Sequence, residues 1–188
     1  MVTSVTNFVI PDTIKIGNAK YKVTSIAESA FEDNEKLKAV TIGSNITKIG
    51  DSAFYGCTSL IKVKGGKDVK VIGEQAFYNC KKLNSITLSS KLTTIEKSAF
   101  YKCTSLKKIT IPSSVSKIGA KAFYGCKKLK TITIKTKKLT SSKVGKQAFK
   151  GIYSKATIKV PKSKLNAYKK IIHMPFSVYN LLHQELIK

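Results

Sequence analysis

The sequence predicts an α/β-type solenoid, in which similar coils of the chain stack along one axis. The dipeptide Ala-Phe recurs at intervals of 23 residues and then once after 26, at 30–31, 53–54, 76–77, 99–100, 122–123 and 148–149. The apolar residues between these dipeptides keep the same register. A fixed period of roughly 20–50 residues is typical of repeat architectures. Because one such unit cannot bury its apolar edge alone, stacked neighbours are expected to share a continuous core.

Each unit contains one segment typical of a short strand. A leucine comes six residues after the Phe of each of the first five dipeptides, at Leu37, Leu60, Leu83, Leu106 and Leu129. An alternating pair follows, at Val40/Ile42, Val63/Gly65, Ile86/Leu88, Ile109/Ile111 and Ile132/Ile134. Period-two alternation indicates a strand with one face inward. We therefore expect the strand of each coil to pair with the next and form a parallel sheet of about five or six strands.

The two ends depart from the repeat. Within residues 1–23, Ile14–Ile16 and Tyr21–Val23 flank Gly17–Lys20, which predicts a β-hairpin that caps and shields the first coil. About six repeats occupy residues 24–160. In residues 161–188, Ser163 and Ser177 each precede apolar residues at helical spacing, which predicts two helices. These form a C-terminal cap or tail, the alternative being a helix that binds a partner or a membrane surface.

The repeat motif resembles that of a known family. Ile49–Leu60 and Ile118–Leu129 both fit I-G-x-x-A-F-x-x-C-x-x-L. This pattern resembles the BspA-like, or Treponema-type, leucine-rich repeat family over roughly residues 24–160. The resemblance implies a leucine-rich-repeat right-handed coil with one parallel sheet on its concave face, an N-terminal β-hairpin cap and a C-terminal helical cap. It also implies a bacterial cell-surface or secreted protein with an adhesin-like role.

The chain is strongly basic, and its charge is unevenly distributed. All 35 basic residues are lysine, and the net charge is +25. Residues 1–96 carry 13 Lys and 9 acids, a net of +4, whereas residues 97–188 carry 22 Lys and 1 acid, a net of +21. Such a field attracts anionic partners. Lysine lacks the planar fork of arginine, so the attraction is diffuse. The lysines lie in several columns of the repeat, which argues against a dedicated nucleic-acid groove.

Two sequence patterns bear on the expected location. The sequence lacks an apolar run of about 18 residues, so we expect no transmembrane segment. Residues 1–6 lack a basic stretch followed by an apolar one, and we expect no signal peptide there. A trimmed form of an exported protein fits these observations, and an extracellular or cell-surface location is the prediction.

Two columns of the repeat are candidate binding surfaces. Tyr55, Tyr78, Tyr101 and Tyr124 follow the Phe column and form an aromatic stripe, which could bind a sugar or peptide or serve only to pack the coils together. Residues between the inward strand positions should face outward, and this sheet face either binds a polar or anionic ligand or is simply solvated. Its candidate contacts are Lys62, Lys64, Thr87, Lys108, Thr110, Thr131 and Thr133.

The cysteines and histidines give no support for catalysis. Cys57, Cys80, Cys103 and Cys126 form one column, for which disulfides, a metal site or burial as small apolar residues are the alternatives. Burial is favoured, because close Cys pairs are absent and a linear ladder cannot surround one ion tetrahedrally. His173 and His183 lie in the atypical tail, and no nucleophile–base pair can be placed. We expect no enzyme activity, catalytic residue, cofactor or metal.

The predicted function is a cell-surface or secreted binding module, adhesin-like, that recognises a host or matrix protein or an anionic polysaccharide through the solenoid surface. The expected partner is thus an extracellular protein or an anionic glycan, and the expected state is a monomer. The alternative is a structural spacer domain in a longer surface protein, with no ligand of its own.

Overall fold

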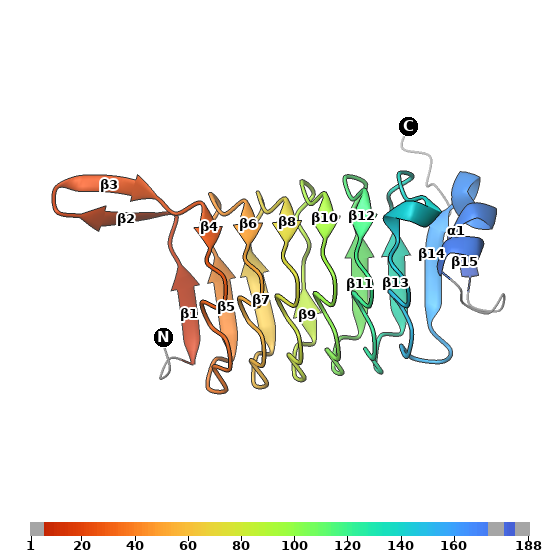
Figure 1. The fold of residues 1–188 in the computed structure, drawn as a ribbon, viewed down its shortest axis with the longest axis horizontal. Coiled ribbons are helices and arrows are strands. Elements are labelled where there is room, and N and C mark those ends of the chain that lie inside the picture. Colours follow the sequence, from red (N-terminus) through yellow and green to blue (C-terminus); the bar gives the residue numbers. More distant parts are fainter. Residues whose placement is uncertain (1–5, 173–178, 183–188) are drawn as a thin grey trace.

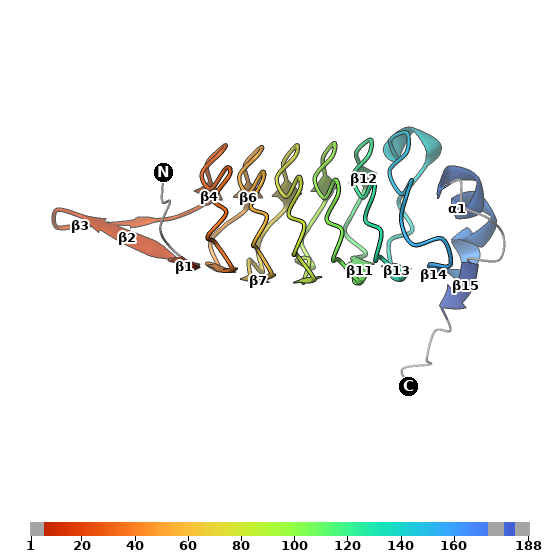
Figure 2. The same cartoon turned by 90° about the horizontal axis from the view of Figure 1, so that it is seen from below.

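The computed structural model describes residues 6–172 and 179–182, which form an elongated stack of coils (Figure 1). In the first five coils a main strand lies on one side and a second, two-residue strand on another, as the view in Figure 2 shows. The main strands are β1 (Asn7–Ile10), β5 (Ala39–Ile42), β7 (Lys62–Gly65), β9 (Ser85–Ile86), β11 (Lys108–Ile111), β13 (Thr131–Ile134) and β14 (Thr157–Pro161). The shorter strands are β4 (Ser25–Ile26), β6 (Lys48–Ile49), β8 (Val71–Ile72), β10 (Thr94–Ile95) and β12 (Lys117–Ile118).

The main strands pair in parallel with the register that the 23-residue period predicts. Val40 lies opposite Val63, and Ile109 lies opposite Ile132. The inward residues of these strands are buried and the residues between them face outward. The short strands form a second parallel ladder in the order β12-β10-β8-β6-β4, which corrects the expectation of a single sheet. This ladder arises because the paired apolar residues, such as Val69 and Ile72, provide a second inward edge in each coil.

The third side of each coil carries the Ala-Phe arc and is held by hydrogen bonds to the next coil. Phe54 N–H donates to the Ala76 carbonyl at 2.8 Å, and Phe77 N–H donates to the Ala99 carbonyl at 2.8 Å. The Phe rings stack from Phe31 to Phe149 with centroids 5.1–5.3 Å apart and planes within 4–7°. The core is therefore a set of continuous columns, and each coil depends on its neighbours.

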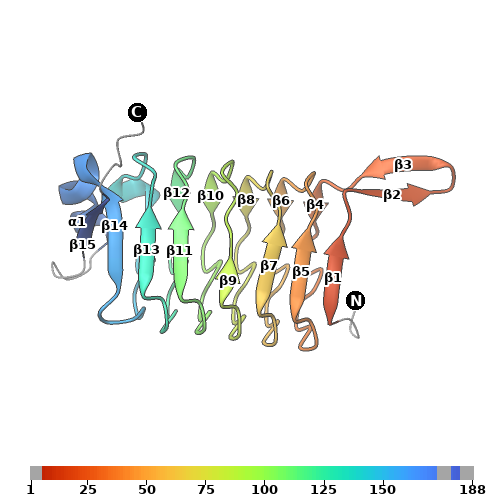
Figure 3. The ribbon, with the colours of Figure 1, turned by 180° about the vertical axis from the view of Figure 1, so that it is seen from behind.

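The main sheet is interrupted between β9 and β11 (Figure 3). Strand β9 is the edge of one four-stranded sheet and β11 is the edge of another. The interruption follows Gly65, which occupies the inward column where the adjacent coils have Ile42 and Leu88. Gly65 has φ +78, and a Cβ there would collide with the Ile42 carbonyl oxygen. With no side chain from Gly65 below the sheet, Leu88 is half-buried, whereas Ile111 in the next coil is fully buried.

The N-terminal hairpin is present, but it does not shield the first coil. Strands β2 (Thr13–Ile16) and β3 (Ala19–Lys22) pair in an antiparallel ladder and extend away from the stack (Figure 1). Ile16 is 63% exposed and Tyr21 is 52% exposed, so the expected shielding is wrong. Strand β1 covers the first coil instead, with Phe8 packed edge-on against Phe31 at 5.1 Å.

Two helices were expected at the C-terminal end, and the part of it that the structure describes contains one. After the short 3₁₀ turn at Lys162–Lys164, helix α1 (Leu165–Ile172) buries Tyr168 completely. The Tyr168 hydroxyl donates to the Thr136 carbonyl at 2.8 Å and accepts from Leu139 N–H at 3.3 Å. The loop that holds Thr136 and Leu139 belongs to the longer 26-residue repeat, which also contains a 3₁₀ turn at Ser141–Lys143. The helix is thus anchored to the last coils.

The helix predicted after Ser177 is wrong over its central part. Residues Tyr179–Leu182 form strand β15, which pairs in parallel with β14. An added strand satisfies the edge of β14, and this tertiary pairing outweighs the helical spacing of the apolar residues. The remainder of that predicted helix, including Ser177, lies outside the described residues, as do His173 and His183.

Candidate functional site

The face of the main sheet carries two adjacent rows of outward side chains. Lys62 lies beside Ser85, and Lys108 lies beside Thr131 in the same row. In the other row Thr110 lies beside Thr133. The candidate contacts Lys62, Lys64, Thr87, Lys108 and Thr110 are exposed, and Thr131 and Thr133 are half-buried. From β5 to β14 these rows contain lysine, threonine, serine and alanine and no acid, and β1 adds Asn7 and Val9, so the face is positive and hydroxyl-rich beyond its first strand.

A hollow of 450 Å³ opens in this face at the interruption of the sheet. Thr87, Lys108 and Thr110 line it, so the structure brings three of the predicted contacts together. It also adds Ser90 and Lys135, which the sequence analysis did not single out. The sequence holds one sign of an irregularity in this part of the sheet. Gly65 is the one glycine in a column that otherwise contains Ile and Leu. Lys62 and Lys64 do not line this hollow.

The tyrosine column forms a continuous stack. Tyr55, Tyr78, Tyr101 and Tyr124 lie with ring centroids 4.6–5.1 Å apart and planes within 5–7°. All four side chains are half-buried. Because each inner ring covers the faces of its neighbours, a ligand can reach only ring edges and hydroxyls along the middle of the stack. Burial raises the pKa of Tyr78, and the adjacent Tyr101 and Tyr55 add to the effect. The tyrosines do not line the hollow in the sheet.

The cysteine column lies in the core, and its thiols are free. Cys57, Cys80, Cys103 and Cys126 are each 0% exposed. Each thiol donates to a Phe carbonyl of the preceding coil at 2.9–3.1 Å, as Cys103 does to Phe77. Burial raises the pKa of Cys57 and of Cys126 to about 12. These thiols therefore stay protonated near neutral pH and serve as small core residues that satisfy a backbone acceptor.

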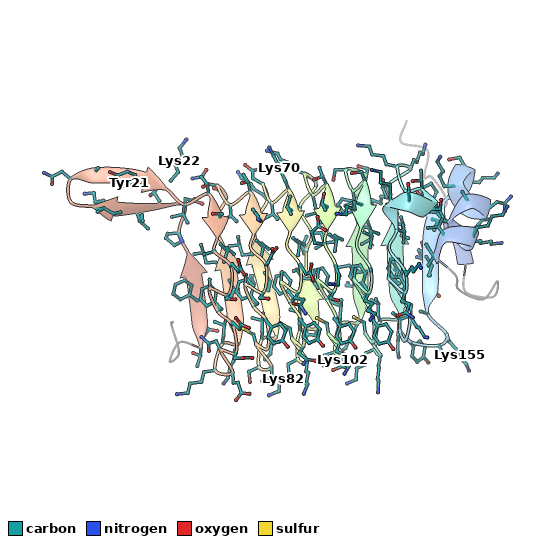
Figure 4. The ribbon with its side chains drawn as sticks, in the orientation of Figure 1. Tyr21, Lys22, Lys70, Lys82, Lys102 and Lys155 are labelled. Atoms are coloured by element: carbon teal, nitrogen blue, oxygen red, sulfur yellow. The ribbon has the colours of Figure 1, made fainter. Side chains whose placement is uncertain are left out.

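The lysines spread over several sides of the molecule. Figure 4 shows Lys82 and Lys102 pointing outward from one long edge of the stack and Lys70 from the opposite edge. Among the described residues, ion pairs join lysines to acids of adjacent coils at Lys91–Asp68, Lys97–Glu74 and Lys117–Glu96. Two of these lysines, Lys97 and Lys117, belong to residues 97–188, where 22 Lys and 1 acid still leave a large excess of positive charge.

Within residues 6–172 and 179–182, no group of three or more His, Cys, Asp or Glu side chains could hold a metal ion. Over the same residues no helix is long and apolar enough to cross a membrane.

Solved structures with a similar fold come from bacterial repeat proteins. A leucine-rich cell surface protein from Faecalibacterium prausnitzii A2-165 is 29% identical, with a TM-score of 0.69 over 84% of this chain and 48% of that one. A leucine-rich repeat protein from Bacteroides ovatus is 27% identical, with a TM-score of 0.62 over 84% of this chain and 52% of that one. The chain thus spans about half the length of these two proteins.

The fold extends to more distant sequences. A leucine-rich repeat protein from T. pallidum is 22% identical, with a TM-score of 0.66 over 92% of this chain and 79% of that one. No curated protein matches the chain.

The repeat family itself is identified directly from the sequence. The model of the BspA type leucine-rich repeat region, in six copies, matches residues 2–130 and 93–181. Family and fold are those of repeat and interaction modules, and nothing in them indicates catalysis. The stacked Phe, Cys and Leu columns are the structural form of the 23-residue unit that defines the repeat, and this chain belongs to the BspA-type leucine-rich repeat family.

Proposed function

We propose that this chain is an adhesin-like binding module of a cell-surface or secreted protein. In this proposal it recognises a host or matrix protein, or an anionic polysaccharide, through the face of the main sheet. The observation that carries the proposal is the composition of that face, where exposed lysines and hydroxyl side chains form two rows without a carboxylate. A positive face of this kind favours encounter with negatively charged partners and orients them.

The similarity to a protein described as a cell surface protein supports the proposed location. Repeat solenoids present extended surfaces on which binding residues of successive coils lie side by side. The four stacked tyrosines are a second candidate contact. In this proposal they act through their edges and hydroxyls, because the inner ring faces are covered.

The proposal is tested with two charge-matched variants. One replaces four lysines of the sheet face, Lys62, Lys64, Lys108 and Lys159, by Gln. The other replaces four exposed lysines elsewhere, Lys48, Lys70, Lys121 and Lys146, by Gln. Gln is compatible with the positive φ of Lys121, since Gln75 and Gln147 occupy the equivalent position in other coils.

Binding of both variants is measured on immobilised matrix proteins, mucin and a sulfated glycosaminoglycan at about 0.15 M salt, where the Debye length is about 8 Å. We expect the sheet-face variant to lose binding and the matched variant to keep most of it. Equal losses would show that only the overall charge matters. Absence of binding by the unaltered chain to every surface would favour the spacer alternative.

A further inference from the structure

The interruption of the main sheet forms a seam with two hollows, one along strand β11 and one just before it. The first hollow, of 450 Å³, borders β11 from Lys108 to Pro112. The second, of 310 Å³, lies just before β11, where Lys107 and Asn84 mark the start of the two facing strand segments. The second hollow is lined by Ile61, Lys82, Asn84, Ser105, Lys107 and Lys128. Both hollows lie along one line between the coil that contains β9 and the coil that contains β11.

Charge and polarity are arranged similarly in both hollows. Lys108 and Lys135 border the first, and Lys82, Lys107 and Lys128 border the second. All five lysines are exposed, and neither hollow is lined by an acid. The hydroxyls of Ser85, Thr87 and Thr110 also line the first hollow. Its apolar residues include Ile86 and Leu88. The seam is therefore complementary to a chain with several negative charges and an uncharged backbone.

The lining of the two hollows favours an acidic peptide over a sugar chain as the ligand. Strands β9 and β11 belong to separate sheets, so the edges that face each other at the seam lack a ladder with one another. The Phe77 and Phe100 rings of these two coils stack at 5.2 Å, so the coils lie about one strand spacing apart and a ligand lies over the seam, across the two hollows, and not between the strands. A sugar chain has less to recognise here, because neither hollow is lined by an aromatic side chain and the inner faces of the tyrosine stack are covered.

We propose that the seam between β9 and β11 is a binding site for an acidic, extended peptide segment of a partner protein. The peptide lies along β11 and places carboxylates against the lysines of both hollows. Four residues of β11 at about 3.3 Å per residue span about 13 Å, so carboxylates four residues apart in an extended peptide reach both hollows. The proposal rests on the proposed function, for which it specifies the ligand class and the position on the sheet face.

The experiment uses a fluorescent deca-glutamate peptide and fluorescence anisotropy at about 0.15 M salt. Thr110→Trp fills the first hollow without changing charge, and Thr41→Trp is its control, at an exposed position of β5 on the same face. Lys108→Gln with Lys135→Gln removes two charges from the seam. Lys15→Gln with Lys20→Gln removes two from the hairpin as the charge control. We expect each seam variant to weaken binding at least about tenfold and each control by less than about twofold.

Two results would overturn the proposal. Equal weakening by both lysine pairs, with no effect of Thr110→Trp, would show diffuse attraction without a site. Binding of oligogalacturonate, but not of the peptide, with the same dependence on Thr110 would show that the seam takes an acidic sugar. Circular dichroism of each variant verifies that it is folded. If the seam variants keep binding while the four-lysine sheet-face variant loses it, the seam proposal fails and the proposed function stands.

Discussion

Phe100 lies at the centre of the aromatic column, and replacing it by Ala tests whether the coils are held together by their shared core. The ring is 0% exposed and stacks on Phe77 at 5.2 Å and on Phe123 at 5.1 Å. Loss of a buried Phe costs about 3–5 kcal/mol, because apolar contacts are lost and a cavity remains. Both neighbouring coils border that cavity. We therefore expect Phe100→Ala to lower the free energy of unfolding by about 3–5 kcal/mol.

The matched control is Phe8→Ala, at the first coil. Phe8 is half-buried and touches the column on one side only, edge-on against Phe31. Its loss should cost about 1 kcal/mol, the typical value for a point substitution. Urea unfolding followed by far-ultraviolet circular dichroism measures both, since the chain has no Trp to report by fluorescence. If Phe100→Ala costs no more than Phe8→Ala, the column does not carry the stability assigned to it. Phe100→Leu serves as the milder variant if the alanine variant is unfolded.

The remaining predictions concern the buried thiols and the glycine at the seam. The thiols should resist iodoacetamide in the folded chain and react on unfolding, because burial keeps them protonated. The pKa of the Cys57 thiol is about 12 in the folded chain, and its ordinary value is 9.0. The contribution of this thiol to the free energy of unfolding is therefore fully present below pH 9 and falls as the pH rises towards 12. Urea midpoints should therefore decline less steeply over that range when Cys57 and Cys126 are replaced by Ala; identical slopes would contradict the burial effect. Gly65→Ala should destabilise by more than Gly125→Ala, which also has a positive φ, because a Cβ at Gly65 meets the Ile42 carbonyl and one at Gly125 meets only the Lys102 side chain at 3.3 Å. Equal urea midpoints for these two variants would refute the close backbone approach.

The repeat register predicts the core of this molecule almost residue by residue. The Phe, Cys and Leu columns are buried as expected, because a fixed period places equivalent residues of successive coils on top of one another. The register does not reveal the second parallel ladder, since two-residue strands such as Lys48–Ile49 carry too little alternation to indicate a strand. It does not reveal strand β15 either, because its pairing with β14 depends on tertiary contact.

The candidate surfaces are only partly predictable for the same physical reason. Alternation along each strand correctly gives the outward direction of Lys108 and Thr110. It cannot give the separation of β9 from β11, because strand pairing depends on tertiary contacts that the alternation does not contain. The tyrosine column is evident from the spacing, but the mutual coverage of its rings depends on the rotamers that stacking selects.

The most direct test of the account is residue-level mapping of the binding surface by ¹H–¹⁵N NMR during titration with the deca-glutamate peptide. The account predicts saturable chemical-shift changes centred on Thr87, Lys108 and Thr110 and extending to Lys107 and Lys135. Backbone amides of the hairpin and of the second ladder should change little. Shifts that follow lysines on every side of the stack, or that centre on the tyrosine column, would contradict a binding site on the face of the main sheet.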